Sequence, residues 1–263
     1  MTTPGNFTSL VQQALTNAGF DTQGIDGAWG AHTSAAASAY QTAHGMTPTG
    51  LPEAELVRAL GVAIPPYPNA ADIASALAGL NDVAVPRDAL KIMLGESGLN
   101  PGPASVAYHD GKPVAGGVFG LLVTQTPDGM SFDDWLALSA AQQIPYAAKF
   151  WRSIASQFSL PLPLTARNLY WTNYLPATVV PDAADDYVFV KSNDTYLPKG
   201  GDWTYHAGFY TENESLDHPL TPGGPPKGYI TAGDMGLAAN RGAMNNPATY
   251  AAVTDALSSQ AVA

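Results

Sequence analysis

Several residue types and patterns are missing from this sequence, and each absence excludes a class of function. There is no cysteine, so disulfides, thiolate metal sites and cysteine nucleophiles are excluded. No phosphate-binding loop, dinucleotide fingerprint or H-E-x-x-H pattern is present, which leaves no basis for nucleotide or zinc-hydrolase chemistry. No apolar run reaches membrane-spanning length. We therefore expect no cofactor, no metal site and no membrane insertion.

Charged residues are scarce, and those present are mostly acidic. They make up 13% of the 263 residues, and Asp and Glu outnumber Lys and Arg by 22 to 11. The net charge of −11 argues against nucleic acid as a partner, and equally against an anionic membrane surface. Apolar residues reach 46%, which is enough for a packed core, while 26 glycines and 22 prolines indicate many loops.

Residues 6–61 have the pattern of a small three-helix module. The first predicted helix is capped by Asn6 or Thr8 and ends at Gly19, and its apolar face is formed by Phe7, Leu10, Val11, Ala14, Leu15 and Ala18. A glycine-rich loop follows. Thr33 is the expected cap of the second helix, and Pro52 is expected to open the third.

This module resembles the peptidoglycan-binding domain type 1 family. The matching residues are Val11-Gln12, Leu15, Gly19-Phe20, Ile25-Asp26-Gly27-Ala28-Trp29-Gly30, Thr33, Tyr40-Gln41, Gly45-Met46, Thr49-Gly50 and Leu60. The resemblance implies a domain that grips cell-wall peptidoglycan without cutting it, through residues among Asp26, Gly27, Trp29, Gly30, Tyr40 and Gln41. From the residues alone, Asp26 is a turn residue, whereas Trp29 is either a core anchor or a platform for stacking on sugars.

Residues 62–70 are predicted to be a linker, because this segment contains three prolines and no charged residue. The predicted division of the chain is therefore a module at 1–61, a linker at 62–70 and a larger domain at 71–263.

The larger domain contains a glutamate in a distinctive setting. Residues 86–96 form a predicted helix with Pro86 in its first turn and a buried face at Leu90, Met93 and Leu94. Glu96 closes this helix, and Ser-Gly and Asn-Pro steps then break it. We expect Glu96 to be half-buried at the edge of a cleft, an environment that raises a carboxyl pKa and makes a general acid available at neutral pH. The alternative is a solvated glutamate near a helix C-terminus.

Further predicted elements follow in order. His109-Asp110-Gly111 is the expected tip of a β-hairpin, and residues 115–122 interleave glycines with apolar residues. Residues 132–158 are predicted to be one long helical region, followed by an aromatic stretch over residues 164–175 that ends at Pro176. Residues 181–247 are expected to be loops that shape a groove, except that residues 230–235 are predicted to be a strand end that leads into a helix, with Thr231 or Asp234 near the cap. The acidic cluster at Asp182, Asp185 and Asp186 is interpreted as a solvated turn rather than a calcium site.

Three of these segments together resemble a goose-type lysozyme or lytic transglycosylase domain. They are Glu96-Ser97-Gly98-Leu99-Asn100-Pro101, the glycine-rich residues 117–122, and Tyr170-Trp171-Thr172-Asn173-Tyr174-Leu175-Pro176. The resemblance implies that Glu96 is the catalytic acid and that the substrate is bound by residues among Ser97, Gly120, Leu121, Gln125 and either Tyr170 or Tyr174. The sequence lacks the family's glutamine directly after Leu122, although Gln125 follows shortly, and its loop between Glu96 and Gly120 is longer.

The fold class predicted from both resemblances is mainly α. It combines a small three-helix wall-binding domain with a larger α-rich, lysozyme-like domain carrying a short β-hairpin and long loops.

The predicted function is cleavage of the β-1,4 bond between N-acetylmuramic acid and N-acetylglucosamine in bacterial peptidoglycan, by a monomer. A lytic transglycosylase would need Glu96 alone. A hydrolase of the inverting kind would need a second carboxylate, for which Asp110 is the candidate, about 6.5–9.5 Å away. Two alternatives remain: a non-catalytic structural protein that holds the wall, and an enzyme acting on chitin.

The arrangement of a wall-binding module before a lytic domain resembles modular phage endolysins. Residues 1–6 lack the basic and apolar regions of a secretory signal. The expected setting is therefore a phage-encoded lysin that acts in the host periplasm after holin release, or one that is carried on the virion. The acidic composition, with pI near 4.6, is unusual for an endolysin and favours the virion.

Overall fold

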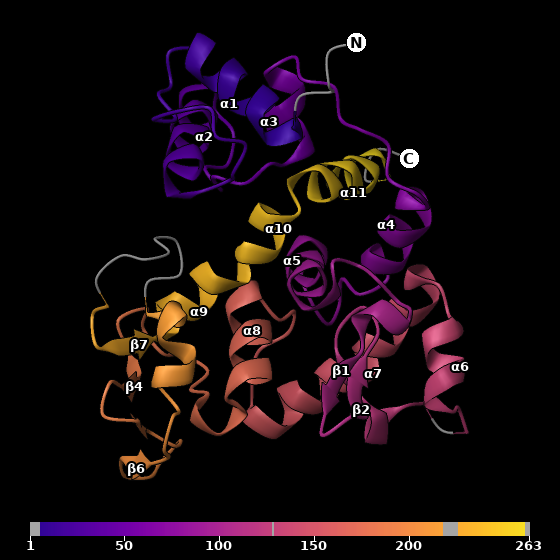
Figure 1. Ribbon diagram of the computed structural model, residues 1–263, viewed down its shortest axis with the longest axis vertical. Coiled ribbons are helices and arrows are strands. Elements are labelled where there is room, and N and C mark those ends of the chain that lie inside the picture. Colours follow the sequence, from indigo (N-terminus) through magenta and orange to yellow (C-terminus); the bar gives the residue numbers. More distant parts are fainter. Residues whose placement is uncertain (1–5, 128, 218–225, 261–263) are drawn as a thin grey trace. The chain divides into compact units, whose positions relative to one another are not determined.

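The computed structural model describes residues 6–127, 129–217 and 226–260, and its helical content confirms the mainly α class. The chain divides into two compact units (Figure 1). The first unit comprises residues 1–78, 93–144 and 242–263, and the second comprises residues 79–92 and 145–241. None of the described helices has the length and apolar character needed to cross a membrane.

The N-terminal module has the three predicted helices, α1 (Phe7–Asn17), α2 (Ala31–Ala43) and α3 (Ala54–Ala59). Asn6 caps α1 as predicted, since its side chain accepts a hydrogen bond from the backbone N–H of Thr8 at 3.1 Å. The expected cap of α2 was wrong. Gly30 is the cap residue, and Thr33 is buried inside the helix, where its hydroxyl accepts a hydrogen bond from Gln12 at 2.9 Å.

A helix from the far end of the chain packs against this module. The C-terminal helix α11 (Pro247–Gln260) contacts α1 and α3, and also α4 (Ala70–Ala78). Its Thr254 hydroxyl accepts a hydrogen bond from the Ala54 N–H at 3.1 Å. The predicted larger domain, residues 71–263, is thus distributed over both units, and its proposed boundary at 62–70 stays a prediction.

The rest of the first unit includes the predicted hairpin, which turns at Asp110 and Gly111. A third strand pairs with the second strand of this hairpin. Its elements are η1 (Pro103–Ser105), β1 (Ala107–His109), β2 (Lys112–Gly116), β3 (Leu121–Leu122), η2 (Val123–Gln125), α6 (Phe132–Ala137) and α10 (Arg241–Asn245). The three strands are antiparallel in the order β1-β2-β3.

Two helices pass from one unit to the other, α5 (Pro86–Ser97) and α7 (Ala140–Phe158). The prediction of one helical region over residues 132–158 was wrong, because α6 ends at Leu138, whose backbone is extended with ψ of 145°. An extended residue cannot continue the helical hydrogen-bond ladder. Pro145 lies inside α7 at the point where the second unit begins.

The second unit joins helices to a small antiparallel sheet with strand order β6-β5-β4-β7. Its elements are α8 (Ala166–Tyr174), η3 (Pro176–Thr178), β4 (Val188–Lys191), β5 (Thr195–Tyr196), β6 (Thr204–Tyr205), η4 (Thr211–Leu216), β7 (Tyr229–Thr231) and α9 (Ala232–Ala239). The expectation of loops over residues 181–247 was therefore wrong for β4, β5, β6 and η4. The strand end and the helix start predicted at residues 230–235 are confirmed, since β7 leads into α9 with Thr231 as the cap. Short strands with few alternating apolar positions give little periodic signal.

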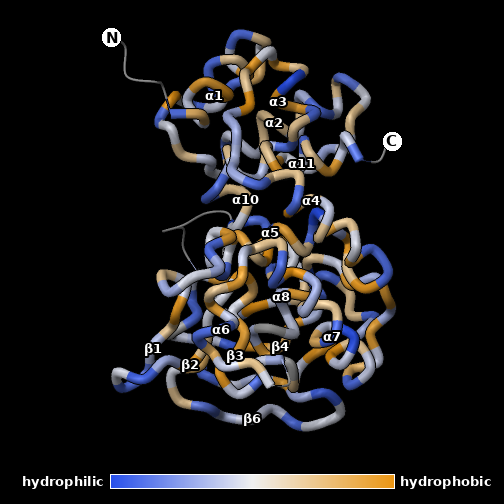
Figure 2. The backbone as a smooth tube through the Cα atoms, turned by 90° about the vertical axis from the view of Figure 1, so that its right-hand side faces the viewer, coloured by the Kyte–Doolittle hydropathy of each residue, from blue (hydrophilic) through white to orange (hydrophobic). Residues whose placement is uncertain are grey.

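The core of the second unit forms where α8 packs against α9 and the sheet. Trp171 is fully buried, lies 4.8 Å from Phe189 between ring centroids, and donates a hydrogen bond from its indole to the Thr178 hydroxyl at 2.9 Å. Hydrophobic segments lie mostly inside each unit, whereas hydrophilic segments mark exposed loops such as the β1–β2 turn (Figure 2).

Candidate active site

Glu96 lies in the last turn of α5, one residue before the helix ends. The predicted apolar face is confirmed, since Leu90, Met93 and Leu94 are all buried. Glu96 itself is exposed rather than half-buried. The reason is helical geometry, because a residue two positions after Leu94 lies about 200° further around the helix and therefore leaves the buried face.

The helix ends through two consecutive residues in the left-handed region. Gly98 and Leu99 both have φ of +64°, and the Gly98 N–H still donates to the Leu94 carbonyl at 3.0 Å. A leucine in this conformation is strained, and its burial in the core offsets the strain. The Asn246 side chain, from residues 242–263 of the same unit, donates a second hydrogen bond to the Leu94 carbonyl at 3.3 Å.

The glycine-rich turn after β2 lies against Glu96. A Cβ added to Gly120 would stand 3.2 Å from the Glu96 Oε2 atom, and Gly120 has φ of +66°. Ser97 joins the same two segments, because its hydroxyl lies 3.1 Å from the Val118 carbonyl and 3.2 Å from the Met93 carbonyl. The structure therefore brings together the first two of the three predicted motifs. The Ser97 hydroxyl positions the turn.

A buried glutamine that sequence reasoning missed holds the turn in place. Gln143 on α7 accepts a hydrogen bond from the Val118 N–H at 2.9 Å and donates to the carbonyls of Trp135 at 2.7 Å and Pro101 at 3.0 Å. Its side chain is completely buried. In the sequence, the one sign of this role is that Gln143 lies on the apolar side of a predicted helix. That position does not show which groups the side chain binds, because its partners come from distant parts of the chain.

The backbone of the turn has little freedom. Gly117, with φ of +87°, has no room for a Cβ, which would lie 2.5 Å from the Trp135 Nε1 atom. The Gly117 N–H donates to the Ser105 hydroxyl at 2.7 Å, and the Trp135 indole donates to the Gly116 carbonyl at 3.1 Å. Hydrogen bonds thus fix residues 116–118, and the Gly120 N–H donates to the Gly117 carbonyl at 3.2 Å, which holds Gly120 against Glu96.

The remaining predicted residues of the first unit differ in position. Leu121 is buried, which makes it a packing residue, and Gln125 is exposed in η2. Asp110 is at the hairpin tip with its side chain 88% exposed and 3.5 Å from the His109 ring. Six residue-to-residue steps, most of them along the extended strand β2, lead from Asp110 to Gly116, a span of about 20 Å. The structure does not bring Asp110 to Glu96.

Tyr170 and Tyr174 lie on α8 in the second unit, so their role opposite Glu96 stays a prediction. The Tyr174 hydroxyl is buried and has no hydrogen-bond partner among the described residues. Burial, and then the nearby Tyr170, raise the pKa of Tyr174 above its ordinary value. Its ring lies 5.9 Å from that of Phe209.

In the N-terminal module, most of the residues implied in wall binding have structural roles. Trp29 is buried and donates its indole N–H to the Gly50 carbonyl at 3.1 Å, which identifies it as a core anchor and excludes the stacking platform. Tyr40 is buried and stacks on His44 at 3.9 Å, and the buried Gln41 side chain accepts from the Gly50 N–H at 2.8 Å. Trp29, Tyr40 and Gln41 are thus structural residues, whereas Asp26 is exposed and its role in wall binding stays a prediction.

The loop of the module is organised by Gln12, one of the residues that carry the family resemblance. Its side chain donates to Asp26 at 2.8 Å and accepts from the Gly27 N–H at 2.9 Å. Asp26 is the predicted turn residue, and its hydrogen bonds, first from Gln12 and then from the Ala28 N–H, lower the pKa of its carboxyl. Gly27 has φ of +78°, and Gly30 is the cap of α2.

The sequence of this module matches a known family model. Residues 4–60 match the family model described as putative peptidoglycan binding domain. The match supports bacterial peptidoglycan as a partner of the chain and covers the three-helix module alone. A comparison with curated proteins and one with solved structures find no match.

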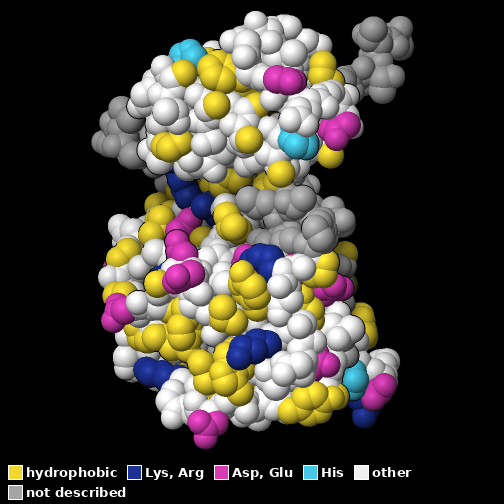
Figure 3. All heavy atoms as spheres, turned by 90° about the vertical axis from the view of Figure 1, so that its left-hand side faces the viewer, with side chains coloured by type: hydrophobic (Ala, Val, Ile, Leu, Met, Phe, Trp, Pro, Cys, Tyr) yellow, Lys and Arg dark blue, Asp and Glu magenta, His cyan; other side chains and the backbone are white. Residues whose placement is uncertain are grey.

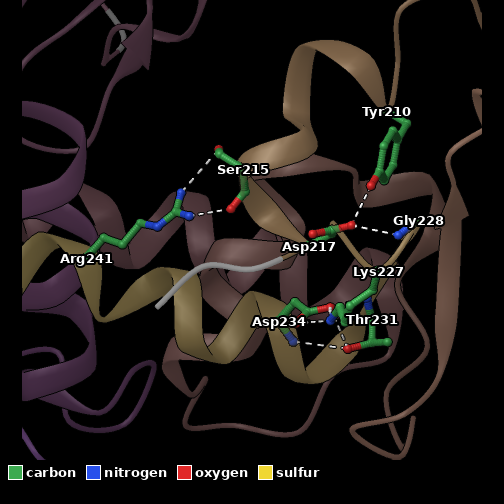
Figure 4. Close-up of polar contacts among 8 residues, drawn as sticks. All are labelled: Tyr210, Ser215, Asp217, Lys227, Gly228, Thr231, Asp234 and Arg241. Carbon is green, nitrogen blue, oxygen red and sulfur yellow. Dashed lines mark hydrogen bonds and ion pairs between the residues drawn. The ribbon is translucent and has the colours of Figure 1, made fainter. Parts of the chain in front are cut away.

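The second unit holds a separate set of buried carboxylates (Figure 4). Asp217 is buried, accepts a short hydrogen bond from the Tyr210 hydroxyl and one from the Gly228 N–H at 2.9 Å. Asp234 is buried as well, accepts from the Thr231 N–H at 2.7 Å and pairs with Lys227 at 2.7 Å. Because their partners come from the protein itself, both carboxylates have structural roles at the start of β7 and α9.

Across the described residues, no group of three or more histidine and acidic side chains could hold a metal ion. In the predicted acidic turn, Asp185 pairs with Arg167 at 3.0 Å and its side chain stays exposed.

Proposed function

We propose that this protein is a peptidoglycan-cleaving muramidase with Glu96 as its general acid and base. The observation that carries the proposal is the approach of the Glu96 carboxylate to Gly120. A glycine at this position leaves its surface open beside the carboxylate, whereas any side chain would occupy the space that a sugar needs. The match of residues 4–60 to a peptidoglycan-binding family indicates peptidoglycan as the polymer on which such an acid would act.

In the proposed reaction, Glu96 donates its proton to the oxygen of the β-1,4 bond as that bond breaks. Positive charge develops on the N-acetylmuramic acid ring. In a lytic transglycosylase, the sugar's own hydroxyl then attacks the ring carbon and returns its proton to the Glu96 carboxylate. The product is a 1,6-anhydro sugar, and water is not consumed.

The transglycosylase reaction is preferred over hydrolysis because of where Asp110 lies. An inverting hydrolase needs its second carboxylate about 6.5–9.5 Å from the acid, with room for a water molecule. Asp110 is at the exposed end of the hairpin, about 20 Å from the base of that hairpin. A single carboxylate suffices for the anhydro-forming route.

The test is digestion of purified sacculi by the full chain and by Glu96→Gln, with the masses of released fragments measured. We expect anhydro fragments from the wild type and at least a 100-fold lower rate for the variant. Glu214→Gln on η4 is the matched control, because Glu214 is also an exposed glutamate and lies outside the peptidoglycan-binding module, and it should digest at the wild-type rate. Full activity of Glu96→Gln would overturn the proposal, and reducing-end products lost in Asp110→Asn would identify a hydrolase.

A second candidate function is a structural protein that binds peptidoglycan without cutting it. The exposure of Glu96 favours this candidate, since an exposed carboxyl lacks the desolvation that prepares a general acid. It predicts that sacculi bind the protein and release no soluble fragments. For the muramidase, the proposed setting is a phage lysin released through a holin or carried on the virion.

A further inference from the structure

One face of the second unit's sheet carries aromatic side chains where polar ones are expected. Cross-strand partners in an antiparallel sheet point to the same face. The pairing places Tyr205 opposite Thr195, Thr195 opposite Lys191, and Lys191 opposite Tyr229, so these four side chains form one row across all four strands. The next row contains Val190 and Ile230, which are both fully buried.

The row faces solvent. Tyr205 is 67% exposed and Tyr229 is 39% exposed, and Lys191 is exposed between them. The solvated face of an antiparallel sheet is normally polar, and exposed apolar groups that gather in one place mark interaction sites. With strands about 4.8 Å apart, the two tyrosines are separated by about 14 Å, a span suited to a short chain of sugar rings.

Trp203 lies beside this row and holds the Lys191 ammonium in place. Trp203 is 37% exposed, and the Lys191 ammonium lies 3.8 Å from the centroid of its ring. This contact holds the lysine and the indole in a defined arrangement before any ligand arrives. Lys191 has no carboxylate partner within the described ranges, whereas the neighbouring Lys227 is already paired with Asp234 at 2.7 Å.

The surface is also hollowed beside the row. A depression of about 460 Å³ is lined by Val188, Lys191, Ser192, Asn193, Gly228 and Tyr229. Lys191 is the charged residue of this lining, in a chain of net charge −11. Figure 3 faces the side on which Figure 1 labels β4, β6 and β7, and it shows hydrophobic side chains gathered around single Lys or Arg side chains.

We propose that this aromatic row, defined as Trp203, Tyr205, Lys191 and Tyr229, is a second binding site for peptidoglycan, separate from the N-terminal module. The tyrosine and tryptophan rings stack on the apolar faces of the sugar rings, and Lys191 pairs with a carboxylate of the glycan strand or its stem peptide. The occupant fits in charge, since the wall is anionic and the row offers a cation in an otherwise acidic protein. The proposal needs peptidoglycan as the partner but does not need cleavage by Glu96.

The experiment measures sedimentation of the full chain with purified sacculi, with all variants made in the Glu96→Gln background so that the sacculi stay intact. We expect the double variant Tyr205→Ala, Tyr229→Ala to bind about tenfold more weakly, because two stacking contacts and the avidity that they add are lost. Tyr146→Ala is the matched control. Tyr146 is 39% exposed on α7 in the same unit, and its loss should change the Kd less than twofold.

The charge is tested separately by Lys191→Gln. We expect this variant to bind about threefold more weakly at low salt, and to lose most of the salt dependence that the Lys191-containing protein shows. Binding of the double tyrosine variant equal to that of its parent would overturn the proposal, as would an equal loss in Tyr146→Ala.

A self-association surface is a distinct outcome of the same experiment. If the double tyrosine variant binds sacculi normally but changes the oligomeric state in size-exclusion chromatography, the row is an interface between copies and the proposal fails. The proposed cleavage is measured by fragment release from the wild type, so its failure would leave this binding result unaffected.

Discussion

Single residues decide the geometry at Glu96, and Gly120 is the most informative of them. Gly120→Ala should strain a backbone with φ of +66° and press a methyl group toward the Glu96 carboxylate, 3.2 Å away. We expect a loss of about 1 kcal/mol in the free energy of unfolding and at least a tenfold loss in sacculus digestion.

The matched control for this prediction is Gly111→Ala at the hairpin tip. Gly111 has φ of +72° but open space around its missing Cβ. It should lose similar stability, measured by chemical denaturation, and keep its activity. Equal activities of the two variants would contradict the role of Gly120 in leaving room beside Glu96.

The buried glutamine gives a second prediction at this scale. Gln143→Leu leaves the Val118 N–H and the carbonyls of Trp135 and Pro101 without their partner. Buried polar groups that lose a hydrogen bond each cost about 1–3 kcal/mol, so we expect about 3 kcal/mol of destabilisation. Both variants are measured by urea titration. Gln142→Leu, at the exposed neighbouring residue, should lower the free energy of unfolding by less than about 1 kcal/mol.

Asp194 gives a prediction for acid stability. Hydrogen bonds from the backbone N–H groups of Tyr210, Thr211 and Gly208 lower the pKa of the Asp194 carboxyl. The folded pKa lies below the unfolded one, so the stabilisation is present above the unfolded value, about 3.9, and disappears as pH falls through the folded pKa. The Tm of the wild type should exceed that of Asp194→Asn near pH 6, and the difference should shrink below about pH 4.

At the scale of elements, the C-terminal helix completes the peptidoglycan-binding module. The Thr254 hydroxyl accepts from the Ala54 N–H at the start of α3, and the Tyr250 hydroxyl lies 3.5 Å from Glu53. On the surface, Arg58 pairs with Asp255 at 2.5 Å. Helix α11 thus covers part of the core of the module at residues 4–60, although Pro247 at its start is nearly 190 residues after Leu60.

This packing is tested by Thr254→Val. The valine keeps the shape of the side chain but leaves the buried Ala54 N–H without an acceptor, so we expect a loss of about 1–2 kcal/mol. Thr254→Ser keeps the hydroxyl and should recover most of that loss. The melting of the module can be followed by proteolysis between α3 and α4. Equal stabilities of the valine and serine variants would show that the hydrogen bond contributes nothing.

For the whole molecule, the contacts form a continuous series from the wall-binding module to Glu96. The module packs on α11, and Asn246, one residue before α11, donates to the Leu94 carbonyl in the last turns of α5. Glu96 follows two residues later. All of these residues belong to the first compact unit. The second unit contributes the aromatic row, so each unit carries its own proposed contact with peptidoglycan.

The sequence predicted the helices that have a clear apolar period. The three helices of the module, the helix ending at Glu96 and the hairpin at Asp110 were all identified, because local periodicity and turn residues determine such elements. It failed where a break is set by one extended residue, as at Leu138, and where strands of two to four residues pair across loops, as in β4, β5 and β6.

The sequence alone therefore determined the mainly α class, the wall-binding module and the order of the motifs around Glu96. Only the tertiary structure decided that Trp29 is core, that Gly120 lies beside Glu96, that Gln143 fixes this turn, and that Asp110 is remote. The physical reason is the range of the interactions. Apolar periodicity and turn preferences act between near neighbours in the chain, whereas burial of a polar side chain and the pairing of distant segments depend on partners that only folding brings together.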